Sequence, residues 1–167
     1  EWCNEEGNCH DVSVAGITTL FFVNDTDSDR DGEILDGDIE INALNFSVTL
    51  DTALGSPKCN SVLANTLTHE VGHLLGLDHT CFIGTGMPPV DNNGVAAPAC
   101  IPTNLLDQSI IDSTMYNFQQ CGETKKASLE ADDIQAICDV YPATGSIPEC
   151  KDHAVKGCCS VAPTQGG

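Results

Sequence analysis

Eleven consecutive residues, HEVGHLLGLDH, begin at His69 and hold three of the five histidines of the chain. His69 and His73 are four residues apart, so on a helix they lie on one face, with Glu70 beside them. Gly76 stands where a left-handed helix end is expected, and such an end lets His79 approach the same point. Three imidazoles and one open position form the ligand set of a catalytic zinc ion. The stretch therefore predicts zinc ligands at His69, His73 and His79, with Glu70 as the catalytic residue.

The alternative is an ordinary amphipathic helix with solvated histidines. Its buried stripe would consist of Leu63, Leu67, Val71 and Leu74. The five specified positions, at about one chance in twenty each over about 160 starting points, match by accident with a probability below ~10⁻⁴. The spacing therefore favours the zinc site.

The composition limits the class of partner. The chain has 167 residues, one domain's length, with 6 Lys and Arg against 25 Asp and Glu, a formal net charge of -19. Such a surface repels phosphate backbones and anionic lipid, so we expect no nucleic-acid and no membrane partner. We expect a monomer.

Ten cysteines indicate disulfides made in an oxidising compartment, and hence a secreted, extracellular protein. The sequence leaves their connectivity open. Short loops favour the pairs Cys3–Cys9, Cys81–Cys100 and Cys121–Cys138. Cys158 and Cys159 are adjacent and cannot readily bond to each other, so at least one needs another partner, for which Cys150 is a candidate.

The hydrophobic pattern predicts an α+β fold. Residues 17–23 are expected to form a buried strand, and residues 39–50 one or two strands joined near Asn42. The zinc motif lies on a helix that ends at Leu75 and begins at a cap on Asn60 or Ser61, and a second helix over 128–141 is capped by Ser128. Residues 80–112 hold four prolines and are expected to be irregular.

An acidic segment predicts a calcium site. From Asp27 the sequence reads DSDRDGEILDGD, which has the ligand spacing of an EF-hand-type loop with Asp at its last position. The candidate ligands are Asp27, Asp29, Asp31, Glu33 and Asp38. The alternative is a solvated acidic turn, which must tolerate repulsion among its carboxylates.

The opening motif resembles HExxHxxGxxH, the signature of the metzincin zinc peptidases, which also carry a methionine turn under the metal. Met87 and Met115 are the two methionines. In the matrixin branch the methionine is followed by Tyr and then by a helix of the form LxxDDI. Tyr116 follows Met115, and Asp132 and Asp133 of "LEADDI" come 17 and 18 residues after Met115. This spacing is that of the matrixin pattern for Met115, and Met87 does not match it. The chain is most similar to secreted bacterial matrixin-like peptidases.

This resemblance implies a metzincin-type catalytic domain over residues 1–142, with a small twisted, mostly parallel sheet, an active-site helix and a C-terminal helix. Residues 143–167 would form a tail rich in Cys, Gly and Pro. Residues 80–112 would be an insertion. Only 68 residues precede His69, fewer than in matrixins, so the first strand and most of the first helix are expected to be missing.

The resemblance also assigns roles. Met115 would form the floor beneath the histidines, and Tyr116 would be a wall of the pocket for the substrate side chain after the cut bond. Glu70 would act as general base toward a zinc-activated water and pass the proton to the leaving amine. The substrate would lie along an edge strand, for which the strand with "DIEIN" is favoured.

Two other functions stay open. Thr80 follows His79, where matrixins usually have Ser and pappalysins often have Thr, so a pappalysin-like peptidase is one alternative. The other is a catalytically inactive, calcium-stabilised metzincin-like binding module, which the intact Glu70 disfavours. The expected function is a secreted zinc-dependent endopeptidase.

Overall fold

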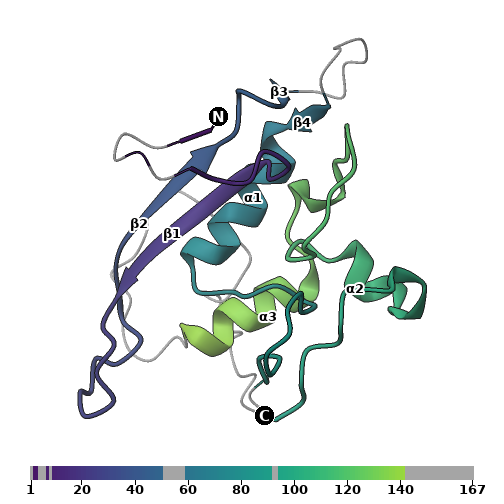
Figure 1. Cartoon of the computed structure of the whole chain (residues 1–167). Coiled ribbons are helices and arrows are strands. Elements are labelled where there is room, and N and C mark those ends of the chain that lie inside the picture. The colour runs from purple at the N-terminus through teal and green to yellow at the C-terminus, as the bar shows by residue number, and fades with distance from the viewer. Residues whose placement is uncertain (1, 4–6, 8, 51–58, 92–93, 142–167) are drawn as a thin grey trace, which may run out of the picture.

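The computed structural model describes residues 2–3, 7, 9–50, 59–91 and 94–141. Within them, strands and helices are combined, as the sequence predicts (Figure 1). The predicted tail 143–167, with its three cysteines, lies outside the described residues.

Two strands form an antiparallel hairpin. β1 (Gly16–Phe22) pairs with β2 (Ile34–Ile41), with Thr19 opposite Asp38. The shorter strands β3 (Ser47–Thr49) and β4 (Asn60–Val62) pair in parallel. The expectation of a mostly parallel sheet is therefore wrong for the described residues, where the longer pairing is antiparallel. The physical reason is the short link between β1 and β2, since parallel strands need a long crossover.

Helix α1 (Leu63–Leu74) follows β4 directly and packs against β1. The predicted caps are wrong: the N-cap is Val62, and Asn60 and Ser61 belong to β4. The Ser61 hydroxyl bonds to the Thr66 hydroxyl at 2.8 Å rather than to a helix N–H group. Strand pairing with β3 thus starts the helix later than the capping pattern predicted.

The segment after α1 is mostly irregular, as predicted. It contains a 3-10 turn, η1 (Thr103–Leu105), and one short helix, α2 (Gln108–Asp112). A further 3-10 turn, η2 (Lys125–Ala127), precedes α3 (Ala131–Val140).

The cap of α3 differs from the prediction. Glu130, and not Ser128, is the N-cap, in a capping box with Asp133. The Ser128 carbonyl instead accepts a hydrogen bond from the Thr114 hydroxyl at 3.1 Å. Ser128 is thus held by Thr114 outside the helix, and α3 begins three residues later, at Ala131.

Disulfides tie these irregular segments together. The predicted bonds Cys3–Cys9 and Cys81–Cys100 are confirmed. The predicted pair Cys121–Cys138 is wrong, because Cys121 bonds to Cys59 across 62 residues, and Cys138 belongs to a different disulfide. In the described part of the chain, no helix combines the length and apolarity needed to cross a membrane.

Candidate metal centre and cleft

The three histidines of the motif converge at one end of α1. Their ligand nitrogens all lie within 4.8 Å of one another, and the Nε2 atoms of His73 and His79 are 3.1 Å apart. Zn–N bonds of about 2.0–2.1 Å in tetrahedral geometry place ligand nitrogens about 3.3 Å apart. The structure therefore brings together the predicted ligands at a spacing that suits one metal ion.

Backbone carbonyls orient two of the rings. His69 Nδ1 donates to the Thr114 carbonyl at 2.7 Å, and His73 Nδ1 donates to the Leu77 carbonyl at 2.8 Å. A carbonyl can only accept, so each ring carries a proton on Nδ1, and Nε2 is the nitrogen left to bind a metal ion. Outer hydrogen bonds of this kind fix the tautomer of metal-binding histidines.

Burial disfavours the charged form of two of the three histidines. It lowers the pKa of His69 to about 3 and the pKa of His79 to about 4, because a buried environment disfavours a positive imidazolium. Neutral imidazole is the form that binds a metal ion. The donor set thus fits a metal ion.

The end of α1 explains how His79 reaches the other two histidines. Gly76 has a φ of 89°, the left-handed conformation that its position predicted. The N–H groups of Gly76 and Leu77 donate to the carbonyls of His73 and Gly72, which is the Schellman helix end. This turn reverses the chain and brings His79 back over the helix.

Met115 packs against the helix at Gly72, between the turns that carry His69 and His73. It is buried, whereas Met87 is 93% exposed. A Cβ atom added to Gly72 would lie 2.3 Å from Met115 Sδ. Met115, the methionine selected by its spacing to Asp132 and Asp133, is therefore the one that packs against this part of α1.

Substituting Gly72 by Ala is expected to destabilise the fold. The new methyl group has no room against Met115, and overpacking of this kind costs about 1–3 kcal/mol. The matched control is Gly86→Ala, since an added Cβ there meets nothing within 4 Å. Urea unfolding of both variants measures the effect, and equal stability would contradict the packing described.

Glu70 is buried beside the histidines and faces β1. The Thr18 hydroxyl donates to Glu70 Oε2 at 2.7 Å, and a Cβ on Gly16 would lie 2.8 Å from Glu70 Oε1. Burial raises the pKa of the Glu70 carboxyl, while the hydrogen bond from Thr18 acts in the opposite direction. A raised pKa suits a group that must take up and release a proton near neutrality.

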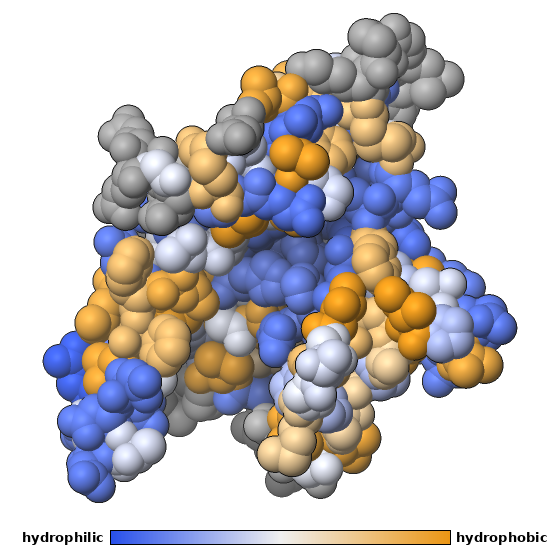
Figure 2. All heavy atoms as spheres, in the orientation of Figure 1, coloured by the Kyte–Doolittle hydropathy of each residue, from blue (hydrophilic) through white to orange (hydrophobic). Residues whose placement is uncertain are grey.

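A cleft of about 1000 Å³ opens in front of this centre. Figure 2 shows it as a hollow with hydrophilic residues at its centre and more apolar residues on both sides. One side is formed by β1, from Gly16 to Phe22, and by the residues before it. The strand with "DIEIN", β2, does not line the cleft, whereas its partner β1 does.

The opposite wall corrects the role predicted for Tyr116. Its side chain is buried against the Cys81–Cys100 disulfide, with Phe118 edge-on at 5.6 Å between ring centroids, and Tyr116 does not line the cleft. The wall is formed by the residues that follow it, Asn117, Phe118 and Gln119. Packing of Tyr116 with Leu106, Ile110 and Ile111 around the disulfide separates its ring from the cleft.

The acidic loop does not gather its predicted calcium ligands. β2 begins at Ile34, so Asp38, the last position of the expected loop, lies in a strand. Glu33 forms an ion pair with Arg30, and Asp31 accepts a hydrogen bond from the Asp25 N–H at 2.8 Å. Within the described residues, which include this loop, the three histidines form the single cluster of three or more close metal-binding side chains.

Sequence analysis missed several residues that shape the centre. Gly16 and Thr18 hold Glu70 from a strand about fifty residues earlier in the chain, and Thr114 orients His69 from 45 residues later. A contact made across such a separation leaves no local pattern. Lys126, which also lines the cleft, had one available signal, because it belongs to the pair Lys125–Lys126 in a chain with six basic residues.

No family model, curated protein or solved structure matches the chain in comparisons with known proteins.

Proposed function

We propose that this protein is a zinc-dependent endopeptidase. The observation that carries the proposal is the convergence of three histidine side chains with a buried carboxylate, Glu70, at the floor of an open cleft. Two imidazole rings held by backbone carbonyls leave their Nε2 atoms free to bind. Nitrogen donors in this number are typical of catalytic zinc sites.

His69, His73 and His79 would hold the metal ion. Zinc, when bound, supplies a Lewis acid and a water molecule of lowered pKa. Glu70 is the base available to take the proton of that water, because it follows His69 directly and its carboxyl lies in the same cleft. Thr18 holds the carboxyl by donating to Oε2, which leaves Oε1 to exchange the proton with the reacting groups.

The cleft favours an extended polypeptide as substrate. One edge of β1 pairs with β2, and β1 itself lines the cleft. An extended peptide can add to a strand edge through main-chain hydrogen bonds, which provide affinity with little demand on sequence. The substrate class is therefore a peptide or protein, and the reaction is hydrolysis of a peptide bond.

The test is incubation of the protein with a library of quenched fluorescent peptides, with cleavage sites located by mass spectrometry. We expect cleavage inside the peptides, which distinguishes an endopeptidase from the inactive binding module. Binding without cleavage by zinc-loaded protein would favour the inactive module instead.

Three disulfides in the described part of the chain support the further proposal that the protein is secreted. They also brace the irregular segments next to the centre, since Cys81 lies two residues after His79. A reducing cytosol would not maintain such bonds.

Calcium binding by the acidic loop is a separate proposal. It requires the carboxylates of residues 27–38 to converge, and their mutual repulsion would then be offset by the ion. We expect added calcium to raise the thermal midpoint of the zinc-loaded protein, measured by calorimetry. An identical midpoint in calcium and in a calcium-selective chelator would contradict this proposal and leave the zinc site unaffected.

A further inference from the structure

Lys126, in the turn η2, is an unusual residue for the wall of this cleft. It is the single Lys or Arg among the residues that line the cleft, and its side chain is 2% exposed. Lysine is almost never so deeply buried unless it is paired. The chain has 25 acidic residues and only six Lys and Arg residues, so one of its few basic side chains lies at the cleft.

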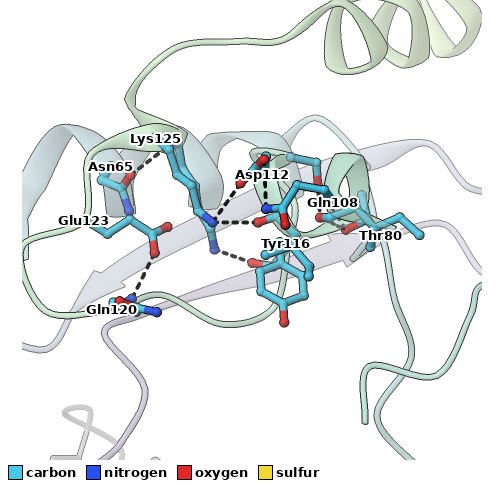
Figure 3. Close-up of polar contacts among 12 residues, drawn as sticks. Asn65, Thr80, Gln108, Asp112, Tyr116, Gln120, Glu123 and Lys125 are labelled. Atoms are coloured by element: carbon cyan, nitrogen blue, oxygen red, sulfur yellow. Dashed lines mark hydrogen bonds and ion pairs between the residues drawn. The ribbon is translucent and has the colours of Figure 1, made fainter. Parts of the chain in front are cut away.

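The hydrogen bonds of Lys126 engage one of the three N–H donors of its ammonium group. Its backbone N–H donates to Asn65 Oδ1 at 2.7 Å, and its Nζ donates to the Tyr116 carbonyl. Nζ lies 5.7 Å from the centroid of the Tyr116 ring. Figure 3 shows Asn65, Tyr116 and Lys125 around this turn. An ammonium group has three N–H donors, and the carbonyl takes one of them.

No carboxylate of the described residues lies within 4.0 Å of Lys126 Nζ. The ion pairs among the described residues are His10–Glu40, Arg30–Glu33 and Lys125–Asp112, and none of them includes Lys126. Glu123 and Glu70 attract the ammonium from a greater distance. A buried cation without an adjacent anion is costly, and this cost would be relieved by a carboxylate that enters the cleft.

The other polar groups on this wall already satisfy one another. Gln119 accepts from Asn65 Nδ2 at 3.0 Å through its Oε1, and its Nε2 donates to the Thr66 hydroxyl at 3.2 Å. Gln119, Thr66 and Lys126 all line the cleft, together with His69. Glu70 lines the same cleft, so Lys126 shares it with the proposed base as well as with His69.

We propose that Lys126 is the ionic recognition group of the cleft, and that the preferred substrates carry an acidic side chain at a residue flanking the cut bond. This inference rests on the proposed peptidase function. The acidic side chain would take the spare donors of Lys126, in a buried position where a charged hydrogen bond is strong. The same position would reject lysine and arginine side chains by like-charge repulsion.

The net charge of -19 predicts a second property of this preference. The protein as a whole repels an acidic peptide at long range, whereas Lys126 attracts its carboxylate at short range. Salt screens exposed charges more strongly than buried pairs. We therefore expect kcat/KM for acidic peptides to rise with moderate salt, as repulsion between protein and peptide weakens.

The experiment compares quenched peptides that differ at one residue, placed on either side of the cut bond: Glu, Gln, Leu or Lys. The zinc-loaded protein is expected to cleave the Glu peptide with a kcat/KM about 10–100-fold above that of the Gln peptide at one of the two positions. Gln matches Glu in size and removes only the charge. Equal kcat/KM for Glu and Gln at both positions would overturn the proposal.

Variants assign the preference to the residue. Lys126→Met should abolish the Glu-over-Gln ratio, and Lys126→Arg should keep part of it. Lys125→Met is the matched control, because Lys125 bonds to Asp112 and the Ile111 carbonyl and does not line the cleft. The Glu-over-Gln ratio of this variant should equal that of the wild type. A Glu-over-Gln ratio that survives in folded Lys126→Met protein would overturn the assignment.

A binding measurement separates this proposal from failure of the proposed function. Fluorescence anisotropy of labelled Glu and Gln peptides with the Glu70→Gln protein reports recognition without turnover, and tighter binding of the Glu peptide is expected. Absence of hydrolysis of every peptide by zinc-loaded wild type would overturn the peptidase proposal itself. If the Glu and Gln peptides bind equally well while the wild type still hydrolyses peptides, the role of Lys126 is overturned and the peptidase proposal is unaffected.

Discussion

Replacing Glu70 by Gln is expected to lower peptide hydrolysis by about 10²–10⁴-fold and to leave the zinc content unchanged. The amide is nearly isosteric with the carboxyl and can still accept the hydrogen bond from Thr18, which now reaches Oε2 at 2.7 Å. What the amide loses is the ability to take a proton. Since Glu70 is not one of the three converging histidine ligands, metal binding should persist.

The measurement is kcat/KM on one quenched peptide, with metal content determined on the same samples by mass spectrometry. Near wild-type turnover in Glu70→Gln protein would show that another group takes the proton. Loss of both zinc and activity would instead show that Glu70 holds the metal site together. Thr18→Val is a useful companion, with a smaller expected loss, because it removes only the hydroxyl that positions the carboxyl.

Replacing His79 by Ala is expected to weaken zinc binding by more than ~100-fold, because loss of outer partners of metal ligands alone costs about 10–100-fold. His79 is the one ligand outside α1, and a backbone turn at Gly76 brings it to the site. Its Nε2 lies 3.1 Å from that of His73. Two histidines on one helix would remain, which is too few for a catalytic zinc site.

The measurement is zinc retention after dialysis against a competing chelator of known affinity. His10→Ala is the matched control, since His10 packs against Trp2 and approaches Glu40, and it does not belong to the histidine cluster. It should retain zinc like the wild type. Full zinc occupancy in His79→Ala protein would contradict the role of His79 as a ligand.

The parts of the site that lie close together in sequence could be predicted. The four-residue step from His69 to His73, and the glycine at position 76, depend on helix geometry alone. The helix bearing them and its left-handed end follow from this local pattern. The short-loop disulfides Cys3–Cys9 and Cys81–Cys100 were likewise predictable from separation along the chain.

The parts formed by distant segments could not be predicted. The Cys59–Cys121 bond spans 62 residues, and the Thr18–Glu70 hydrogen bond joins a strand to a helix 52 residues later. Pairing of β4 with β3 overrode the predicted caps of α1. Tyr116 was assigned to the cleft from its place beside Met115, yet packing against a disulfide turned it inward. Tertiary contacts decide such positions, and no local pattern records them.

The most direct test of the peptidase proposal is removal and return of the metal. The protein is stripped with a chelator, dialysed, and titrated with zinc while hydrolysis of a quenched peptide is followed. The proposal predicts that activity disappears on stripping and returns in proportion to zinc, reaching a plateau at one ion per chain, since one histidine cluster is present among the described residues. Hydrolysis that persists in the stripped protein, or a fully zinc-loaded protein that cleaves no peptide in the library, would contradict it.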